Sequence, residues 1–349
     1  MIKFDEFMKR FKEGRMSRRN FITGATLFGV SAAMAGNLAD SLNPRAAYAE
    51  ENKFRAKEVY KIAFVATAIA HSVPAAWHKG MEREAAYHDN IDYMMEDGQW
   101  KAEIQIEKME NLINQQVDAI ILQAVDAAAL SPSVVEAEEA GIPVVNLNLD
   151  TVAKHAGIVT MVTIESGKLI ADGMAKQLGG KGKIVILQSP PGASIGVDRE
   201  TGFRQVLKEK YPEMEIIAAQ NAEWQKEKGM AVMQGFLQAY DKIDGVYGIN
   251  DSMAEGAALA AEAAGRLNEM VIWGNDGERD ALTMIEQGKL AGTIYTNCFE
   301  QGAAALRLAE FLVTCGVNPL DLPYQGVVKI APKVVTKDNV AEIPEADRW

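Results

Sequence analysis

The side chains that carry most enzyme chemistry are few in this sequence, and their spacing forms no metal site. Its four histidines match neither an H-x-x-x-H nor an H-E-x-x-H pattern, and two cysteines cannot close a zinc site. No iron–sulfur or haem attachment motif occurs. Asp276 with His71 could act as an acid–base pair, but these two residue types alone specify no reaction. We therefore expect no catalytic residue, no bound metal and no cofactor, and a protein that is not an enzyme.

The first 49 residues differ from the rest of the chain. Ser17–Ile22 reads Ser-Arg-Arg-Asn-Phe-Ile and resembles a twin-arginine export signal, an apolar stretch runs from Phe21 to Gly36, and Ala47-Tyr48-Ala49 resembles a cleavage site. The apolar stretch is shorter than the roughly 20 residues that a membrane-spanning helix needs. We expect export to the periplasm by the twin-arginine route with cleavage after Ala49; an uncleaved membrane anchor is the alternative.

The rest of the chain is strongly acidic. Of the 36 basic and 48 acidic residues, 28 and 44 lie after residue 49, so this part carries a net charge of −16. Such a body repels phosphate backbones, which argues against nucleic acid as a partner.

The two cysteines, Cys298 and Cys315, are expected to stay unpaired. A helix predicted over residues 299–314 would separate them by roughly 24 Å at 1.5 Å per residue, whereas a disulfide requires Cα atoms within about 7 Å. Folding in the cytoplasm before twin-arginine export would also keep both thiols reduced.

Short runs rich in Val and Ile alternate with segments whose apolar residues recur at helical spacing. The expected strands are Tyr60–Ala66, Ala119–Gln123, Pro143–Leu147, Lys183–Gln188, Gly245–Ile249 and Met270–Trp273. The expected helices are Glu103–Gln115, Ser133–Ala140, Gly167–Leu178, Gly202–Glu209, Gly229–Tyr240 and Met253–Ala264. This alternation predicts parallel sheets covered on both faces, and the length suits two such units. We expect an α/β fold with two doubly wound parallel-sheet lobes, and ligand contacts just beyond the carboxyl ends of the strands.

Several segments at the strand ends resemble the type I periplasmic binding proteins, specifically their ribose-binding branch. They are Ile62–Thr67, Val117–Gln123, Ala140–Val145, Arg199–Phe203, Gly248–Ala257, Gly274–Gly277 and Lys289–Ile294, within a resemblance that spans about residues 59–335. It implies a cleft between two lobes joined by three crossings, near residues 163, 296 and 325. One lobe would hold residues 50–163 and 297–325, and the other 164–296 and 326–349.

The resemblance also implies which residues contact a ligand. Asn250 and Asp276 match polar contacts, and Trp224 matches an aromatic that stacks on the ligand; a helix cap and interlobe packing are their structural alternatives. Asp251, the neighbour of Asn250, is expected to cap the helix that follows. In the other lobe the implied contacts are Thr67, His71, Asn148 and Asp150. Thr296 and Asn297 replace a family glutamine, and one of them is expected to contact ligand.

The sequence departs from the family pattern where arginines and phenylalanines are expected. Leu149 and Val197 stand in place of two arginines, although Arg199 lies two residues further on and is also expected to contact the ligand. Val73-Pro74 replaces paired phenylalanines, so the aromatic wall on this side is absent or supplied by Trp77, whose alternative is a place in the core. Trp100 could reach the mouth of the cleft. These departures put ribose itself in doubt and suggest a different hydroxyl geometry or a less polar ligand.

The expected function is capture of a small sugar or polyol. Aromatic faces cover the C–H face of a sugar ring, and a buried hydroxyl partner left unpaired costs about 1–3 kcal/mol, so the hydrogen-bond set fixes specificity. The family implies closure of a hinge around the ligand and delivery by a monomer to the permease of an ABC importer, with a chemoreceptor as an alternative partner. A non-sugar ligand such as a furanone signal of the autoinducer type stays open. A sugar-responsive transcription regulator shares the two-lobe core, but the export signal and the charge of −16 argue against it.

Overall fold

The structure is a computed structural model that describes residues 7–9, 25, 59–191, 193–315 and 326–349. The predicted export signal and its cleavage site after Ala49 therefore lie outside the described residues, apart from positions 7–9 and 25. Within the part of the chain that is described, none of the helices combines the length and apolarity that a bilayer crossing requires.

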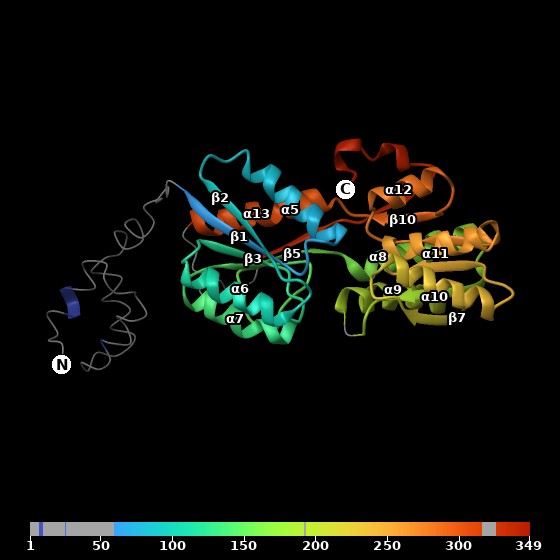
Figure 1. Ribbon diagram of the computed structural model, residues 1–349, viewed down its shortest axis with the longest axis horizontal. Helices are drawn as coiled ribbons and strands as arrows, with labels where there is room; N and C mark the ends of the chain where they lie inside the picture. The colour runs from blue at the N-terminus through green and yellow to red at the C-terminus, as the bar shows by residue number, and fades with distance from the viewer. Residues whose placement is uncertain (1–6, 10–24, 26–58, 192, 316–325) are drawn as a thin grey trace.

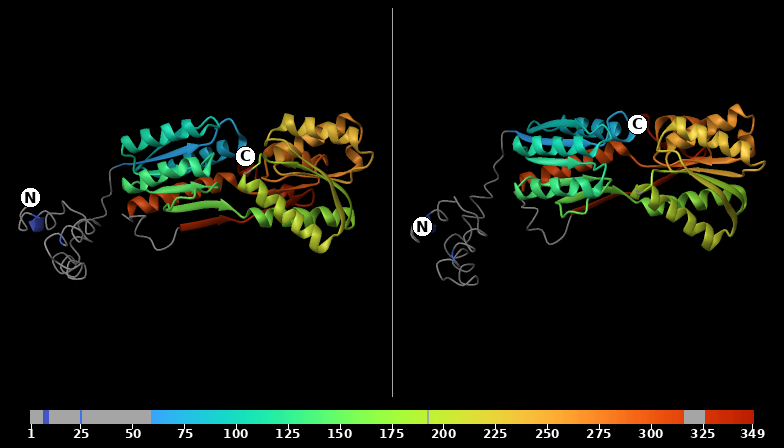
Figure 2. Two further views of the ribbon diagram at one scale, coloured as in Figure 1. Left: turned by 90° about the horizontal axis from the view of Figure 1, so that it is seen from below. Right: turned by 60° about the horizontal axis from the view of Figure 1, so that its bottom comes forward.

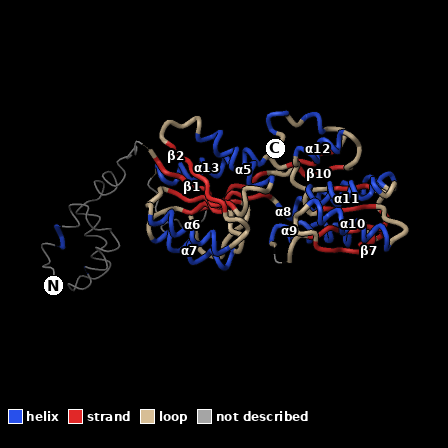
Figure 3. The backbone as a smooth tube through the Cα atoms, viewed as in Figure 1, coloured by secondary structure: helices blue, strands red, loops and turns tan. Residues whose placement is uncertain are grey.

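Each of two lobes is built around one six-stranded sheet (Figures 1 and 3). The first sheet has the order β11-β5-β4-β3-β1-β2, with β1 (Tyr60–Ala66), β2 (Ile91–Asp97), β3 (Ala119–Leu122), β4 (Val144–Leu147), β5 (Gly157–Met161) and β11 (Gly326–Ile330). The second has the order β12-β10-β9-β8-β6-β7, with β6 (Lys181–Gln188), β7 (Glu213–Asn221), β8 (Gly245–Gly248), β9 (Val271–Trp273), β10 (Gly292–Tyr295) and β12 (Lys333–Thr336). The strand pairs are parallel except for β10 with β12. The predicted α/β fold with two doubly wound lobes is confirmed.

Helices cover both faces of the sheets, which explains why the central strands are apolar throughout. The first lobe contains α5 (Ser72–Ala85), α6 (Ala102–Asn114), α7 (Ala127–Glu139) and α13 (Cys298–Thr314). The second contains α8 (Thr163–Leu178), α9 (Ser194–Lys210), α10 (Lys226–Ala239), α11 (Asp251–Ala263) and α12 (Arg279–Glu286). In β1, Ile62 and Phe64 belong to the core formed with α5 and α13, while Ala63 and Val65 belong to the core formed with α6 and α7. Because successive side chains of a strand point to opposite faces, both faces of β1 must be apolar.

The cysteines lie at the two ends of one helix. Cys298 is the first residue of α13 and is buried, and Cys315 follows its last residue and is exposed. Both are free, as the helical spacing predicted.

Three segments cross between the lobes, and the structure corrects the third. The first crossing is at Val162, between β5 and α8, and the second is at Thr296-Asn297, between β10 and α13. The third was expected near residue 325, with residues 326–349 in the second lobe. Instead β11 pairs with β5 from Gly326 to Ile330, so the chain stays in the first lobe through β11 and crosses only before β12.

The carboxyl terminus lies at the junction of the lobes (Figure 2). The indole N–H of Trp349 donates to the carbonyl of Thr296 in the second crossing, at 3.0 Å. Its side chain packs against the apolar cores of both lobes. Arg279 donates its backbone N–H to the carbonyl of Trp349 at 2.7 Å, and Arg83 of α5 donates to the carbonyl of Ala346 at 3.3 Å. The tail thus contacts a helix from each lobe.

Three helix pairs are in backbone contact through glycines. The pairs are α5 with α13, α8 with α9, and α10 with α11. In each pair a glycine of either helix faces backbone of the other: Gly80 and Gly302, Gly167 and Gly202, Gly229 and Gly256. A Cβ atom at any of the six would lie within 3 Å of that backbone. The helices can approach this closely only because the side chains are missing there.

Candidate ligand-binding site

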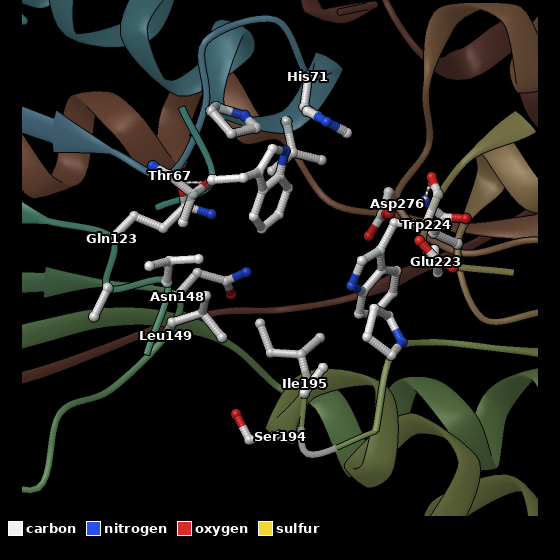
Figure 4. A pocket seen from close by; sticks show the side chains of 18 of the residues that line it. Thr67, His71, Gln123, Asn148, Leu149, Ser194, Ile195, Glu223, Trp224 and Asp276 are labelled. Carbon is white, nitrogen blue, oxygen red and sulfur yellow. Dashed lines mark hydrogen bonds between the residues drawn. The ribbon is translucent and has the colours of Figure 1, made fainter. Parts of the chain in front are cut away.

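A cleft of about 850 Å³ lies between the lobes and is lined from both of them. Figure 4 shows Thr67, His71, Gln123, Asn148 and Leu149 on one side and Glu223, Trp224 and Asp276 facing them across the gap. Most of these residues follow the carboxyl end of a parallel strand, where such sheets bind ligands. Nine of the residues that the sequence predicted line this cleft: Thr67, His71, Trp77, Asn148, Asp150, Arg199, Trp224, Asn250 and Asp276.

Asp276 is a buried carboxylate that the second lobe presents to the cleft. It is buried beyond the end of β9, with a φ of 134°, and its Oδ1 accepts hydrogen bonds from Arg199 and, at 3.3 Å, from Asn275. Its Oδ2 accepts none among the described residues, which leaves that oxygen to a ligand hydroxyl. Burial raises the pKa of Asp276 above its usual range, and the adjacent guanidinium opposes the rise.

Arg199 restores a guanidinium that the sequence analysis judged lost at Val197. Its side chain is buried, and its Nη1 donates to the carbonyl of Ile249 at 2.9 Å while its Nη2 bonds Asp276. Val197 and Arg199 lie on different faces of α9. The side chain of Val197 is exposed, whereas that of Arg199 is buried and points toward the cleft. The expectation of a less polar ligand rested on two missing arginines, at Leu149 and Val197. Arg199 replaces the second of them, so only the arginine missing at Leu149 still supports that expectation.

The roles expected for Asn250 and Asp251 are partly reversed. Asn250 caps α11, because its Oδ1 accepts from the backbone N–H of Met253 at 2.9 Å, and its Nδ2 donates to the carbonyl of Trp224 at 3.2 Å. Asp251 was expected to be the cap, but its fully buried carboxylate accepts from the backbone N–H groups of Gly277 and Glu278 at 2.6 and 2.8 Å. The Thr293 hydroxyl donates to its other oxygen at 2.6 Å. Asp251 thus fixes the loop that carries Asp276.

A further buried carboxylate at the cleft was missed by the sequence analysis. Glu278 lines the cleft two residues after Asp276 and accepts from the Ser252 hydroxyl at 3.0 Å. Burial, then the charge of Asp251, raises its pKa well above the usual range, and burial raises the pKa of Asp251 to about 8. The only signal in the sequence was its position just beyond the same strand end as Asp276.

In the first lobe a chain of amides positions the polar contacts. Gln123 accepts from the backbone N–H and the hydroxyl of Thr67 at 3.1 and 2.9 Å through the same oxygen. Its own Nε2 donates to no described residue and is available at the cleft. Behind it, Gln105 donates to the carbonyls of Ala66 and Gln123 and accepts from Val125. Gln123 was not predicted as a contact because it ends an apolar run that indicated only a strand.

Asn148 and Asp150 follow β4 at the cleft. Asn148 has a φ of 65°, and its buried Oδ1 has no hydrogen-bond partner among the described residues. Since a buried acceptor without a partner costs free energy, this oxygen suits a ligand hydroxyl. Asp150 accepts from Asn146 at 2.9 Å and lies 3.2 Å from the buried ring of His155. Half of its side chain is exposed, so it lies at the rim of the site.

The aromatic residues of the first lobe are divided between core and cleft. Trp77 touches the cleft but is fully buried in the core, with its indole N–H bonded to Gln301 at 2.8 Å, so the core alternative describes it better. Trp100 lines the cleft with 44% of its surface exposed and meets His71 edge to face, with ring centroids 4.9 Å apart. Burial lowers the pKa of His71, which favours a neutral ring.

The two remaining predicted contacts lie outside the cleft lining. Thr296 is buried in the second crossing and donates its backbone N–H to the carbonyl of Asp276 at 2.9 Å. Asn297 caps α13, because its side chain accepts from the backbone N–H of Glu300 at 3.0 Å. Both residues lie in the second crossing, and the ligand contact expected of one of them stays a prediction.

A serine at the cleft invites a catalytic interpretation that its surroundings do not support. Residues 192–196 match the pattern G-x-S-x-G, and Ser194 lines the cleft as the first residue of α9. A nucleophile needs a base within hydrogen-bond reach. No histidine or carboxylate bonds the Ser194 hydroxyl among the described residues, and no group of three metal-ligating side chains occurs among them.

Comparisons with known proteins agree with this geometry. A model for the periplasmic binding protein domain matches residues 62–316. A xylitol-binding protein of Mycolicibacterium smegmatis is 36% identical over 75% of this chain and 73% of its own length. A periplasmic solute-binding protein of an ABC transporter from Actinobacillus succinogenes, solved with bound D-allose, has a TM-score of 0.75 and 28% identity, over 81% of this chain and 99% of that one. One from Bacillus halodurans, solved with bound myo-inositol, has a TM-score of 0.74 and 29% identity over 82% and 98%.

Proposed function

The chain belongs to the periplasmic binding protein family, and from this premise we propose that it captures a small sugar or polyol in its cleft and delivers it to the permease of an ABC importer. Its relatives are transport proteins that bind their substrates, and it is not an enzyme. The observation that carries the proposal is the pairing of polar groups across one cleft. Asp276 offers a free carboxylate oxygen from one lobe, and Asn148 and Gln123 offer an unpaired acceptor and donor from the other.

The mechanism is closure of the hinge around the ligand. A ligand that bonds to both lobes binds the closed form more tightly than the open form and shifts the population toward it. Moving such an equilibrium from 1:99 to 99:1 requires roughly a 10⁴-fold difference in affinity. Contacts in both lobes supply that difference, because each is complete only when the lobes meet. The closed monomer would then dock on the permease, with a chemoreceptor as an alternative partner.

A thermal-shift screen of the purified chain tests the ligand class. The panel contains pentoses, hexoses, linear polyols, inositols and a furanone signal of the autoinducer type. A ligand present at 100 times its Kd stabilises the folded state by about 2.7 kcal/mol, which raises the melting temperature measurably. We expect stabilisation by at least one sugar or polyol. Stabilisation by the furanone alone would replace the proposal with the non-sugar alternative.

We further propose that the protein reaches the periplasm by the twin-arginine route and loses residues 1–49. The support is the pair Arg18-Arg19 and the Ala47-Tyr48-Ala49 site in the sequence. Mass spectrometry of the exported protein should find Glu50 at its amino terminus. Replacing both arginines with lysine should leave the precursor in the cytoplasm; normal export of that variant would argue for another route.

A further inference from the structure

Two tryptophans occupy equivalent places in the two lobes. The edge strands β2 and β7 each pair with the first strand of their own lobe, β1 or β6. Trp100 lies three residues after β2 ends at Asp97, and α6 begins two residues later. Trp224 lies three residues after β7 ends at Asn221, and α10 begins two residues later. The spacing is identical although the two sequences around it share little else.

The two loops also share their internal hydrogen bonds. The side chain of Asp97 accepts from the backbone N–H of Gln99 at 3.1 Å, and that of Asn221 accepts from Glu223 at 2.8 Å. In both loops the tryptophan and the residue before it have positive φ angles, 50° and 58° in the first and 52° and 63° in the second. Left-handed conformations of non-glycine residues cost on the order of 1 kcal/mol or more each. In both lobes this strained backbone places the indole of a tryptophan in the lining of the same cleft.

Trp100 keeps an open ring face at the cleft although its backbone is fixed. Nearly half of its surface is accessible, while its backbone N–H is tied to the carbonyl of Thr67 at 2.8 Å and its ring rests on His71. A large aromatic held rigidly at a cleft rim with an open face is suited to cover a ligand, since it loses little conformational freedom on binding.

We propose that Trp100 and Trp224 cover opposite faces of one ligand, and that this ligand is a six-membered polyhydroxylated ring, a pyranose or a cyclitol, rather than a linear polyol. This inference rests on the proposed function. A ring whose hydroxyls are mainly equatorial presents C–H groups on both faces and hydroxyls around its edge. The indoles would cover the two faces, and the polar groups of Asp276, Asn148 and Gln123 would bond the edge. A linear polyol must also lose several bond rotations to fit between two walls.

Isothermal titration calorimetry of the full-length mature chain tests this inference. The probes are myo-inositol and D-allose as rings and xylitol as the linear polyol. We expect at least one ring to bind tenfold or more tightly than xylitol. Trp100→Ala and Trp224→Ala should each weaken ring binding by about 10- to 100-fold, and Trp100→Phe should recover most of that loss. Tyr87→Ala, which removes an aromatic that is 84% exposed and does not line the cleft, should leave affinity unchanged.

The outcomes separate this inference from the function on which it rests. If the wild type binds a ring and Trp100→Ala binds it equally well, the second wall is overturned and the sugar-binding function stands. Tighter binding of xylitol than of both rings overturns the ring preference in the same way. If no sugar or polyol in the thermal-shift panel binds, the proposed function is wrong, and the inference that rests on it is wrong as well. Circular dichroism of each variant establishes that the fold is intact.

Discussion

Replacing Asp276 with asparagine should lower ligand affinity at least 100-fold, about 2.7 kcal/mol, while the ligand-free protein still folds. The carboxylate offers a free oxygen to a ligand hydroxyl while the guanidinium of Arg199 holds its other oxygen. An amide at this position keeps an acceptor for Arg199 but loses the charge that makes hydrogen bonds to hydroxyls strong. The measurement is the ligand-induced rise in melting temperature, followed by a calorimetric Kd.

Asparagine is the informative substitution because alanine would remove the buried hydrogen-bond partner of Arg199 and could destabilise the fold. Asp276→Ala would leave Arg199 buried without its partner, and breaking a buried ion pair from one side costs roughly 3–5 kcal/mol. Loss of binding by that variant could then reflect loss of fold. Asp280→Asn makes the same chemical change on an exposed residue of α12 and should alter neither quantity. If Asp276→Asn keeps the full ligand-induced shift, the ligand lies elsewhere and the central assignment of the site is wrong.

The parts of the fold that the sequence predicted are those where burial leaves no choice. β1, β3 and β4 are covered on both faces, so each is a continuous apolar run and was located to within a residue or two. The edge strand β2 has the sequence Ile-Asp-Tyr-Met-Met-Glu-Asp and lies half-buried, and it gives no such run. Helix α7 begins six residues earlier than expected because Asp126 caps it, its side chain accepting from two backbone N–H groups. The helix continues through Pro132, a residue that usually ends or starts a helix. A cap is a local contact that apolar periodicity does not reveal.

The site was predicted better by position than by role. Residues just beyond strand ends do line the cleft, because parallel strands bring those ends to one edge of the sheet. Asn250 lines the cleft as expected, but it also caps α11, which was expected of Asp251, because both residue types suit that position. Thr296 and Asn297 were assigned by resemblance alone; neither lines the cleft, and Asn297 caps α13. Arg199 lines the cleft as expected, because its helix face points inward although its position is two residues from that of the family arginine.

Gly167→Ala should destabilise the ligand-free protein by about 3 kcal/mol and weaken ligand binding as well. A Cβ atom there would lie within 3 Å of the backbone carbonyl of Arg199, and Gly202 faces the carbonyl of Ile164 in the same helix contact. Backbone of a packed helix cannot give way as a flexible side chain can, so α8 and α9 must separate, and overpacking of this kind costs 1–3 kcal/mol or more. Since α9 carries Arg199 and α8 begins at the first crossing, the displacement would reach both the Asp276 ion pair and the hinge. Urea unfolding measures the stability and calorimetry the affinity.

Gly235→Ala is the matched control, because it makes the same change inside a helix where nothing lies within 4 Å of the added methyl group. Alanine restricts the unfolded chain and favours helix, so this variant should be about 0.5–1 kcal/mol more stable than the wild type, with unchanged affinity. The same intrinsic gain applies to Gly167→Ala, so the difference between the two variants measures the helix contact itself. If both substitutions stabilise the protein, α8 and α9 have room for a side chain between them. Arg199 would then depend on its hydrogen bonds, rather than on helix packing, for its place in the cleft.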